Sequence, residues 1–324
     1  TDLGGGRYEY HSLHPLAKVY EPKNYEMDFW GPIPIWEAVR DSRNVPAVRT
    51  LDDVGAQNVV ETARKMGITG HVPPYPSLAL GAADLGLKDM VRAYGTVAIE
   101  GQQSPPPFLI RRIVDRNGKV LESREQAPGE QVIDKQTNFQ MIQCLQGVAQ
   151  RGTGARIGGE IQWPLAGKTG TTDDHTDAWF VGFSTRIACG VWVGLDEKKT
   201  IFKGADGAKA AVPIWIEFMK TATQGTPKEE FQVPEGMEMV EIDRVTGLRA
   251  TGATAAQDRV LLAFKPNQAP KEESDAEAIR RVREARERAR SQAQDLRIWG
   301  AGRPKEEAPP EPDWSRTPDP NRRP

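Results

Sequence analysis

The chain has 324 residues, 38% hydrophobic and 27% charged, which suits one large soluble domain or two ordinary ones. Its net charge of −2 provides no global field to steer nucleic acid, and no apolar run approaches the roughly 18 residues that span a bilayer. Two cysteines, Cys144 and Cys189, exclude a disulfide framework, and four scattered histidines do not suggest a metal site.

Hydrophobic periodicity in the first half of the chain predicts a series of short helices. The expected helices cover residues 34–42, 45–53, 56–66, 87–100 and 134–150. Ile35 and Val39 are expected to point inward from the first of them, and Asn44 is a candidate cap for the second.

The pattern then changes to that of β-structure. Residues 107–122 predict a hairpin about an Asn117-Gly118 turn, and strands are expected over 163–171, 177–183 and 187–194. The middle strand is apolar on both faces, which is typical of a buried strand. A last helix is expected over Ile214–Thr223. This order of helices, strands and helix predicts an α+β fold, with an antiparallel sheet covered by helices.

Composition divides the chain near residue 270, which predicts a domain over 1–270 and an extension over 271–324. Charged residues make up 25 of the last 54. Within them 275–298 predicts a helix with a thin apolar stripe, best interpreted as a solvated helix, with a partner-binding helix as the alternative. The Pro-rich stretch from Arg303 is expected to be disordered, and the whole extension is expected not to pack on the domain.

The first chemically informative motif is Lys168-Thr169-Gly170-Thr171-Thr172. On a strand, Lys168 and Gly170 face one side, and Thr169 and Thr171 face the other. Gly170 allows another backbone to approach closely, while hydroxyls beside a lysine charge suit a substrate carboxylate. Taken alone, the motif is more often an ordinary strand edge.

The second motif is Ser42-Arg43-Asn44, at a corner between two predicted helices. A serine there can relay a proton, and the amide of Asn44 can both donate and accept a hydrogen bond. Taken alone, this motif is usually a helix cap.

Together, the two motifs and their flanking segments resemble bifunctional (class A) penicillin-binding proteins. The resemblance runs from about residue 20 to about residue 265, and six segments occur in the family's order. They are Glu37–Arg49, Pro76–Gly81, Met90–Tyr94, Leu145–Val148 with Gly152–Gly154, Ala166–Thr172 followed by Asp177–Gly182, and Gly190–Gly194.

The resemblance implies the fold shared by penicillin-binding transpeptidases and serine β-lactamases. It also implies a DD-transpeptidase that cross-links peptidoglycan stem peptides through an acyl-enzyme. Ser42 and Lys168 would move a proton near the nucleophile, and Asn44 would hydrogen-bond the amide of the substrate. No metal or organic cofactor is implied.

The remaining residues of the Lys168 motif are implied to bind substrate. The hydroxyls of Thr169 and Thr171 would hold the terminal carboxylate, and the backbone N–H of Thr171 would form half of the oxyanion hole. Gly170 and Thr172 complete this substrate-binding stretch.

One departure from the family is decisive for activity: no serine in the chain has a lysine three positions later, so Ser-x-x-Lys is absent. That motif is expected ahead of Thr1, with a glycosyltransferase domain and a membrane anchor further upstream. The chain is therefore expected to be an N-terminally truncated piece, inactive alone.

The family also implies partners and a location. The partners are D-Ala-D-Ala stem peptides and β-lactam antibiotics, and the location is the extracytoplasmic face of a bacterial cytoplasmic membrane, the periplasm. Nucleic acid is not among the expected partners. Two alternatives remain open: a serine β-lactamase-like hydrolase, and a binding module without catalysis.

Overall fold

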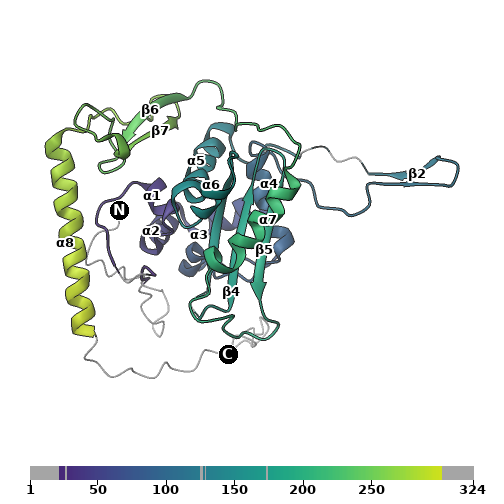
Figure 1. Cartoon of the computed structure of the whole chain (residues 1–324), viewed down its shortest axis with the longest axis horizontal. Helices are drawn as coiled ribbons and strands as arrows, with labels where there is room; N and C mark the ends of the chain where they lie inside the picture. The colour runs from purple at the N-terminus through teal and green to yellow at the C-terminus, as the bar shows by residue number, and fades with distance from the viewer. Residues whose placement is uncertain (1–21, 26–27, 125–126, 128, 173, 301–324) are drawn as a thin grey trace, which may run out of the picture.

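A three-stranded antiparallel sheet lies at the centre of the protein (Figure 1). In this computed structural model, residues 22–25, 28–124, 127, 129–172 and 174–300 are described, the side chains of 292–300 excepted. Strands β3 (Ala166–Thr171), β4 (Asp177–Phe183) and β5 (Ala188–Gly194) are hydrogen-bonded in the order β3-β4-β5. All three predicted strands are confirmed.

Helices cover both faces of this sheet, as the sequence predicts. On one face, Trp215 of α7 (Val212–Ala222) packs edge-on against Phe180 of β4, with ring centroids 5.0 Å apart. On the other face, Tyr94 of α4 (Leu87–Ala98) contacts Phe183 at 6.3 Å. Burial on both faces explains why β4 is apolar from Ala178 to Phe183.

Helix α5 (Lys135–Arg151) completes the core on the α4 side. Its apolar residues at helical spacing, Phe139, Ile142 and Leu145, are buried in one cluster with Phe183. Asp134 caps the helix by accepting the backbone N–H of Thr137 at 3.0 Å.

The short helices before α4 are found where they are predicted, but two details are wrong. They are α1 (Ile35–Arg40), α2 (Asn44–Val54) and α3 (Ala56–Lys65), followed by a 3₁₀ turn, η1 (Pro76–Leu80). Ile35 is 56% exposed, because α1 instead buries Glu37 and Arg40, which form a salt bridge. Asn44 does not cap α2: the oxygen of the Asn24 side chain accepts the N–H of Val45 at 3.2 Å.

Three further elements are short. Helix α6 (Arg156–Glu160) follows α5 after a turn, η2 (Gly207–Ala211) is a π-helical turn that leads into α7, and η3 (Ala256–Asp258) is a 3₁₀ turn. The turn between α5 and α6 and the start of η2 both contact β3, so they contribute to the site described below.

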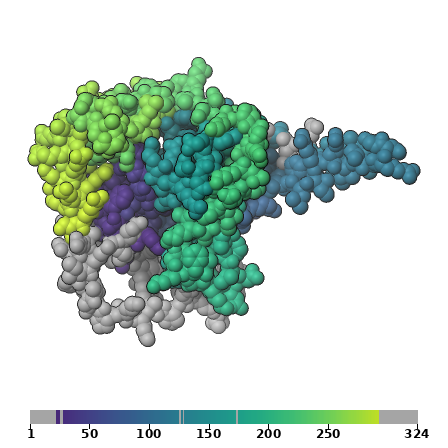
Figure 2. Space-filling view, in the orientation of Figure 1, coloured from purple at the N-terminus to yellow at the C-terminus, as the bar shows by residue number. Residues whose placement is uncertain are grey.

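The predicted hairpin forms and projects away from the rest of the protein (Figures 1 and 2). Strands β1 (Arg112–Val114) and β2 (Val120–Ser123) pair only with each other. The carboxylate of Asp115 accepts the N–H groups of Asn117 and Lys119, and Gly118 adopts a φ of +83°, so this local turn defines the hairpin.

A second small sheet is not predicted. Strands β6 (Glu238–Asp243) and β7 (Arg259–Phe264) are antiparallel, and Val240, Ile242 and Val260 form a core cluster against which Trp36 packs. Alternating apolar residues in both segments are the signal that could have identified them.

Helix α8 (Ala276–Gly300) confirms the predicted helix but contradicts its predicted extension into solvent. Arg286 donates to the carbonyl of Val245 at 3.1 Å and to that of Pro32 at 3.2 Å. Ala289 is 4% exposed and lies next to Gly31, where small residues allow close approach. Figure 2 shows α8 lying against the amino-terminal helices, so a narrow stripe plus arginine hydrogen bonds is enough for docking. The Pro-rich tail lies outside the described residues, and the boundary near 270 remains a prediction.

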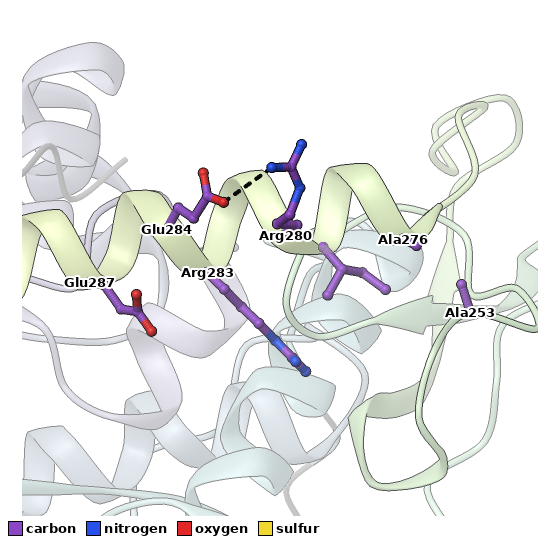
Figure 3. Close-up of a pocket in the computed structure, with 7 residues that line it drawn as sticks. Ala253, Ala276, Arg280, Arg283, Glu284 and Glu287 are labelled. Carbon is purple, nitrogen blue, oxygen red and sulfur yellow. Dashed lines mark hydrogen bonds and ion pairs between the residues drawn. The ribbon is translucent and has the colours of Figure 1, made fainter.

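A shallow groove of about 430 Å³ follows the start of α8 (Figure 3). Within it, Arg280 pairs with Glu284 at 3.4 Å. None of its lining residues belongs to the predicted site; they are Ala253, Ala276, Ile279, Arg280, Arg283, Glu284 and Glu287. Over the described part of the chain, no helix is long and apolar enough to cross a membrane.

Candidate active site

Ser42 and Lys168 meet at the centre of the candidate site. The ammonium of Lys168 donates to the hydroxyl of Ser42, with 2.7 Å between Nζ and Oγ. Ser42 occupies the turn between α1 and α2 and has a φ of +52°, an unusual value for a residue with a side chain. The fold therefore brings together the two motifs that the sequence singled out, at the cost of a strained backbone.

The environment of Lys168 is poor in negative charge. Burial lowers the pKa of its ammonium from the ordinary 10.5 to about 8. Its ammonium also donates to the carbonyl of Thr169 at 3.1 Å, and no carboxylate in the described residues is within 4.0 Å. A lysine with this pKa can release or take up a proton near neutral pH.

Asn44 is the first residue of α2, two positions after Ser42. Its side-chain amide donates to the carbonyl of Lys23 at 2.8 Å. The segment before α1 thus holds Asn44 in place, while Asn24 from the same segment binds the start of α2.

The threonines of β3 point to the opposite face from Lys168, as predicted. The hydroxyls of Thr169 and Thr153 lie 2.7 Å apart, and the hydroxyl of Thr171 accepts the N–H of Gly207 at 3.0 Å. Thr172, just beyond the strand, binds Thr176 at 2.9 Å.

The backbone of Gly207 packs against that of Gly170. The missing side chain of Gly207 allows this approach, whereas a Cβ on Gly170 would meet the side chain of Trp179 at 3.2 Å. A Cβ on Gly207 would lie 2.9 Å from the carbonyl oxygen of Gly170 and 2.4 Å from that of Trp179. The start of η2 therefore packs directly on β3, which a side chain at Gly207 would prevent.

Helix α1, which ends just before Ser42, is anchored by a buried carboxylate that the sequence interpretation missed. Glu37 is 2% exposed and forms ion pairs with Arg40, Arg244 and Arg286 at 3.2–3.3 Å. Arg244 follows β6 and Arg286 lies on α8, so both of these carboxy-terminal regions form ion pairs with α1 at Glu37. Glu37 lies on the opposite side of the helix from Ile35 and Val39, so hydrophobic periodicity gave no signal of its burial.

Among the described residues, no group of three or more His, Cys, Asp or Glu could hold a metal ion. The candidate site presents hydroxyls, one amide and one lysine with a lowered pKa.

Comparison with known proteins agrees with this arrangement. The family model for the penicillin binding protein transpeptidase domain matches residues 77–220. Penicillin-binding protein 1A of Aquifex aeolicus is 42% identical over 223 residues, which are 68% of this chain and 30% of that protein. The chain belongs to the penicillin-binding protein transpeptidase family.

Solved structures of penicillin-binding proteins share the fold. Penicillin-binding protein 1A from Haemophilus influenzae matches 83% of this chain and 45% of its own, with a TM-score of 0.72 and 24% identity. An imipenem acyl-enzyme complex of penicillin-binding protein A from Mycobacterium tuberculosis matches 65% of this chain and 53% of its own, with a TM-score of 0.53 and 20% identity. The α+β fold and the likeness to class A proteins of the 1A type are thereby confirmed. The chain spans 30–36% of the length of the first curated relatives.

Proposed function

We propose that this chain is part of a serine DD-transpeptidase that cross-links peptidoglycan stem peptides. The single observation that supports this most is the 2.7 Å contact between Lys168 and Ser42. It joins two motifs from distant parts of the sequence at a lysine whose pKa is lowered to about 8.

In this proposal a serine of the Ser-x-x-Lys type attacks the penultimate D-Ala carbonyl. The attack forms an ester, breaks the peptide bond and releases the terminal D-Ala as an amine. The hydroxyl proton of the attacking serine passes to the lysine of its own motif, and Lys168 passes a proton through Ser42 to the leaving nitrogen. The amine of a second stem peptide then displaces the serine and forms the cross-link. The amine gives a proton to Lys168, and the serine regains its proton from the lysine of its motif.

The other site residues bind substrate in this proposal. Asn44 hydrogen-bonds the amide of the stem peptide, and the hydroxyls of Thr169 and Thr171 hold the terminal carboxylate. The N–H of Thr171 stabilises the oxyanion together with the N–H of the nucleophilic serine; removing one such donor typically costs about 2.7–4 kcal/mol of transition-state stabilisation. Gly170 and Thr172 complete the edge along which the peptide lies.

None of the 324 residues provides the Ser-x-x-Lys serine. The nucleophile therefore has to come from a longer protein that includes this chain, called the full-length protein below. Its substrates place the proposed activity on the extracytoplasmic face of a bacterial membrane. β-Lactams would acylate the same serine, as the imipenem acyl-enzyme of the Mycobacterium tuberculosis relative illustrates for that protein.

A fluorescent penicillin tests the proposal. The full-length protein should retain label after denaturation, and the 324-residue chain should not. Lys168→Ala should reduce the labelling rate at least tenfold, because the proton carrier next to Ser42 is removed. Lys119→Ala, on the exposed hairpin, is the control and should label normally.

The outcomes separate the three functions considered. No labelling of the full-length protein would favour a binding module without catalysis. Rapid label release with hydrolysed penicillin would indicate a β-lactamase-like hydrolase. Unchanged labelling of Lys168→Ala would remove Lys168 from the mechanism.

A further inference from the structure

The turn between α5 and α6 contacts both halves of the candidate site. The backbone N–H of Thr153 donates to the carbonyl of Arg40 at 3.4 Å, two residues before Ser42. The Thr153 hydroxyl lies 2.7 Å from that of Thr169, the residue after Lys168. Thr153 is thus hydrogen-bonded to both segments that carry the catalytic motifs.

The position of Thr153 is fixed by close packing on either side of it. A Cβ at Gly152 would lie 2.3 Å from the Arg40 carbonyl oxygen, so only glycine fits there. On the other side, Gly154 donates its N–H to the carbonyl of Val148 at 3.1 Å. The hydroxyl of Thr153 is therefore held against β3 by a turn with little freedom to move.

The number of hydrogens available at Thr169 gives this contact a direction. A threonine hydroxyl has one hydrogen and two acceptor lone pairs. A carboxylate accepts only, so Thr169 must donate its single hydrogen to a bound carboxylate. The contact between the hydroxyls then requires Thr153 to donate and Thr169 to accept.

Thr171 shows the same arrangement with a different donor. Its hydroxyl accepts the backbone N–H of Gly207 at 3.0 Å, which leaves its own hydrogen available. Both hydroxyls on this face of β3 therefore have a protein donor within hydrogen-bond distance and one hydrogen left for a ligand.

We propose that Thr153 is a positioning residue for recognition of the substrate carboxylate. It donates to Thr169 and thereby directs the Thr169 hydrogen toward the carboxylate. The inference rests on the proposed function, because it takes the ligand of Thr169 to be the carboxylate of a stem peptide or a β-lactam. Thr153 itself contacts neither the nucleophile nor the bond that breaks.

The test compares Thr153→Val and Thr153→Ser in the full-length protein. Valine keeps the shape and loses the hydroxyl, whereas serine keeps the hydroxyl. Each variant is acylated by benzylpenicillin, which has a free carboxylate, and by its methyl ester, which has none. Second-order rate constants are measured, and the saturation curve separates binding of benzylpenicillin from the acylation step.

Thr153→Val should lower the rate constant for benzylpenicillin about tenfold, mainly through weaker binding, because a hydrogen bond to a charged group is made less well. Its rate constant for the methyl ester should change less than twofold. Thr153→Ser should stay within about threefold of the original protein with both compounds.

Two results would overturn the inference and leave the proposed function intact. One is an equal loss of the Thr153→Val rate constant with benzylpenicillin and with its methyl ester, which indicates a structural role. The other is no loss with either compound. If the unaltered full-length protein is not acylated by benzylpenicillin at all, the proposed function fails and the inference fails with it.

Discussion

The ammonium of Lys168 lies 2.7 Å from the hydroxyl of Ser42, although 126 residues separate them in the sequence. Lys168 comes from an extended strand and Ser42 from a turn with positive φ. Neither residue has a carboxylate partner among the described residues, so the protonation state of the pair depends on how readily the lysine loses its proton.

The pKa of Lys168 provides the first prediction. NMR of the lysine Cε resonances should show one lysine titrating near pH 8, since burial lowers its pKa from 10.5. Between pH 8 and pH 10.5, Lys168 is more often protonated in the unfolded chain than in the folded one. Its contribution should therefore make the free energy of unfolding rise from about pH 8 to about pH 10.5. Lys168→Arg identifies the resonance by removing it. A Lys168 signal titrating near 10.5 would contradict the prediction.

The backbone of Ser42 provides the second prediction. Its φ of +52° costs little for glycine and more for any residue with a Cβ. Ser42→Gly should therefore be more stable than Ser42→Ala by about 1 kcal/mol in urea unfolding, although both lack the hydroxyl. In the full-length protein both variants should lose acylation to a similar extent. Equal stability would mean that Ser42 is not strained.

The docking of α8 provides the third prediction. Arg286→Ala removes hydrogen bonds to Pro32, Glu37 and Val245 and leaves the Glu37 carboxylate with one partner fewer. The free energy of unfolding should fall by about 2 kcal/mol. Arg281→Ala, at an exposed position on the same helix, should change it by less than about 0.5 kcal/mol. Similar effects of the two substitutions would indicate that α8 is not docked.

Gly152 provides the fourth prediction. In Gly152→Ala the new methyl group would lie 2.3 Å from the Arg40 carbonyl oxygen, so α1 or the turn has to shift. We expect a loss of about 1–3 kcal/mol in stability. Gly159→Ala is the control, because nothing lies within 4 Å of its Cβ position and alanine favours the helix there. A neutral Gly152→Ala would show that this turn is loosely packed.

The secondary-structure elements that were predicted correctly are those determined by residues close together in the sequence. The continuous apolar run of β4, the Asn117-Gly118 turn and the helical spacing in α5 are all local patterns, so those elements are found as expected. The two motifs of the candidate site were identified because each is a short segment with chemically distinctive residues.

What the sequence did not reveal depends on contacts between distant segments. Asn24 rather than Asn44 caps α2, and Glu37 is buried because arginines from β6–β7 and from α8 reach it. The same arginines explain why α8 docks despite its thin apolar stripe. Thr153 was recognised as part of a family segment, but its contact with Thr169 appears only in three dimensions.

The projecting hairpin separates two stretches of chain that share one core. Val97 of α4 precedes it and Phe139 of α5 follows it, yet both are buried in the same cluster. Five exposed basic residues lie in or next to the hairpin, at Arg111, Arg112, Arg116, Lys119 and Arg124. Brief trypsin treatment should therefore cut the hairpin first and yield two fragments on a denaturing gel that still elute as one particle under native conditions. The folded body would then behave as a non-covalent complex of two peptides, which permits one piece to be labelled isotopically and recombined with the other.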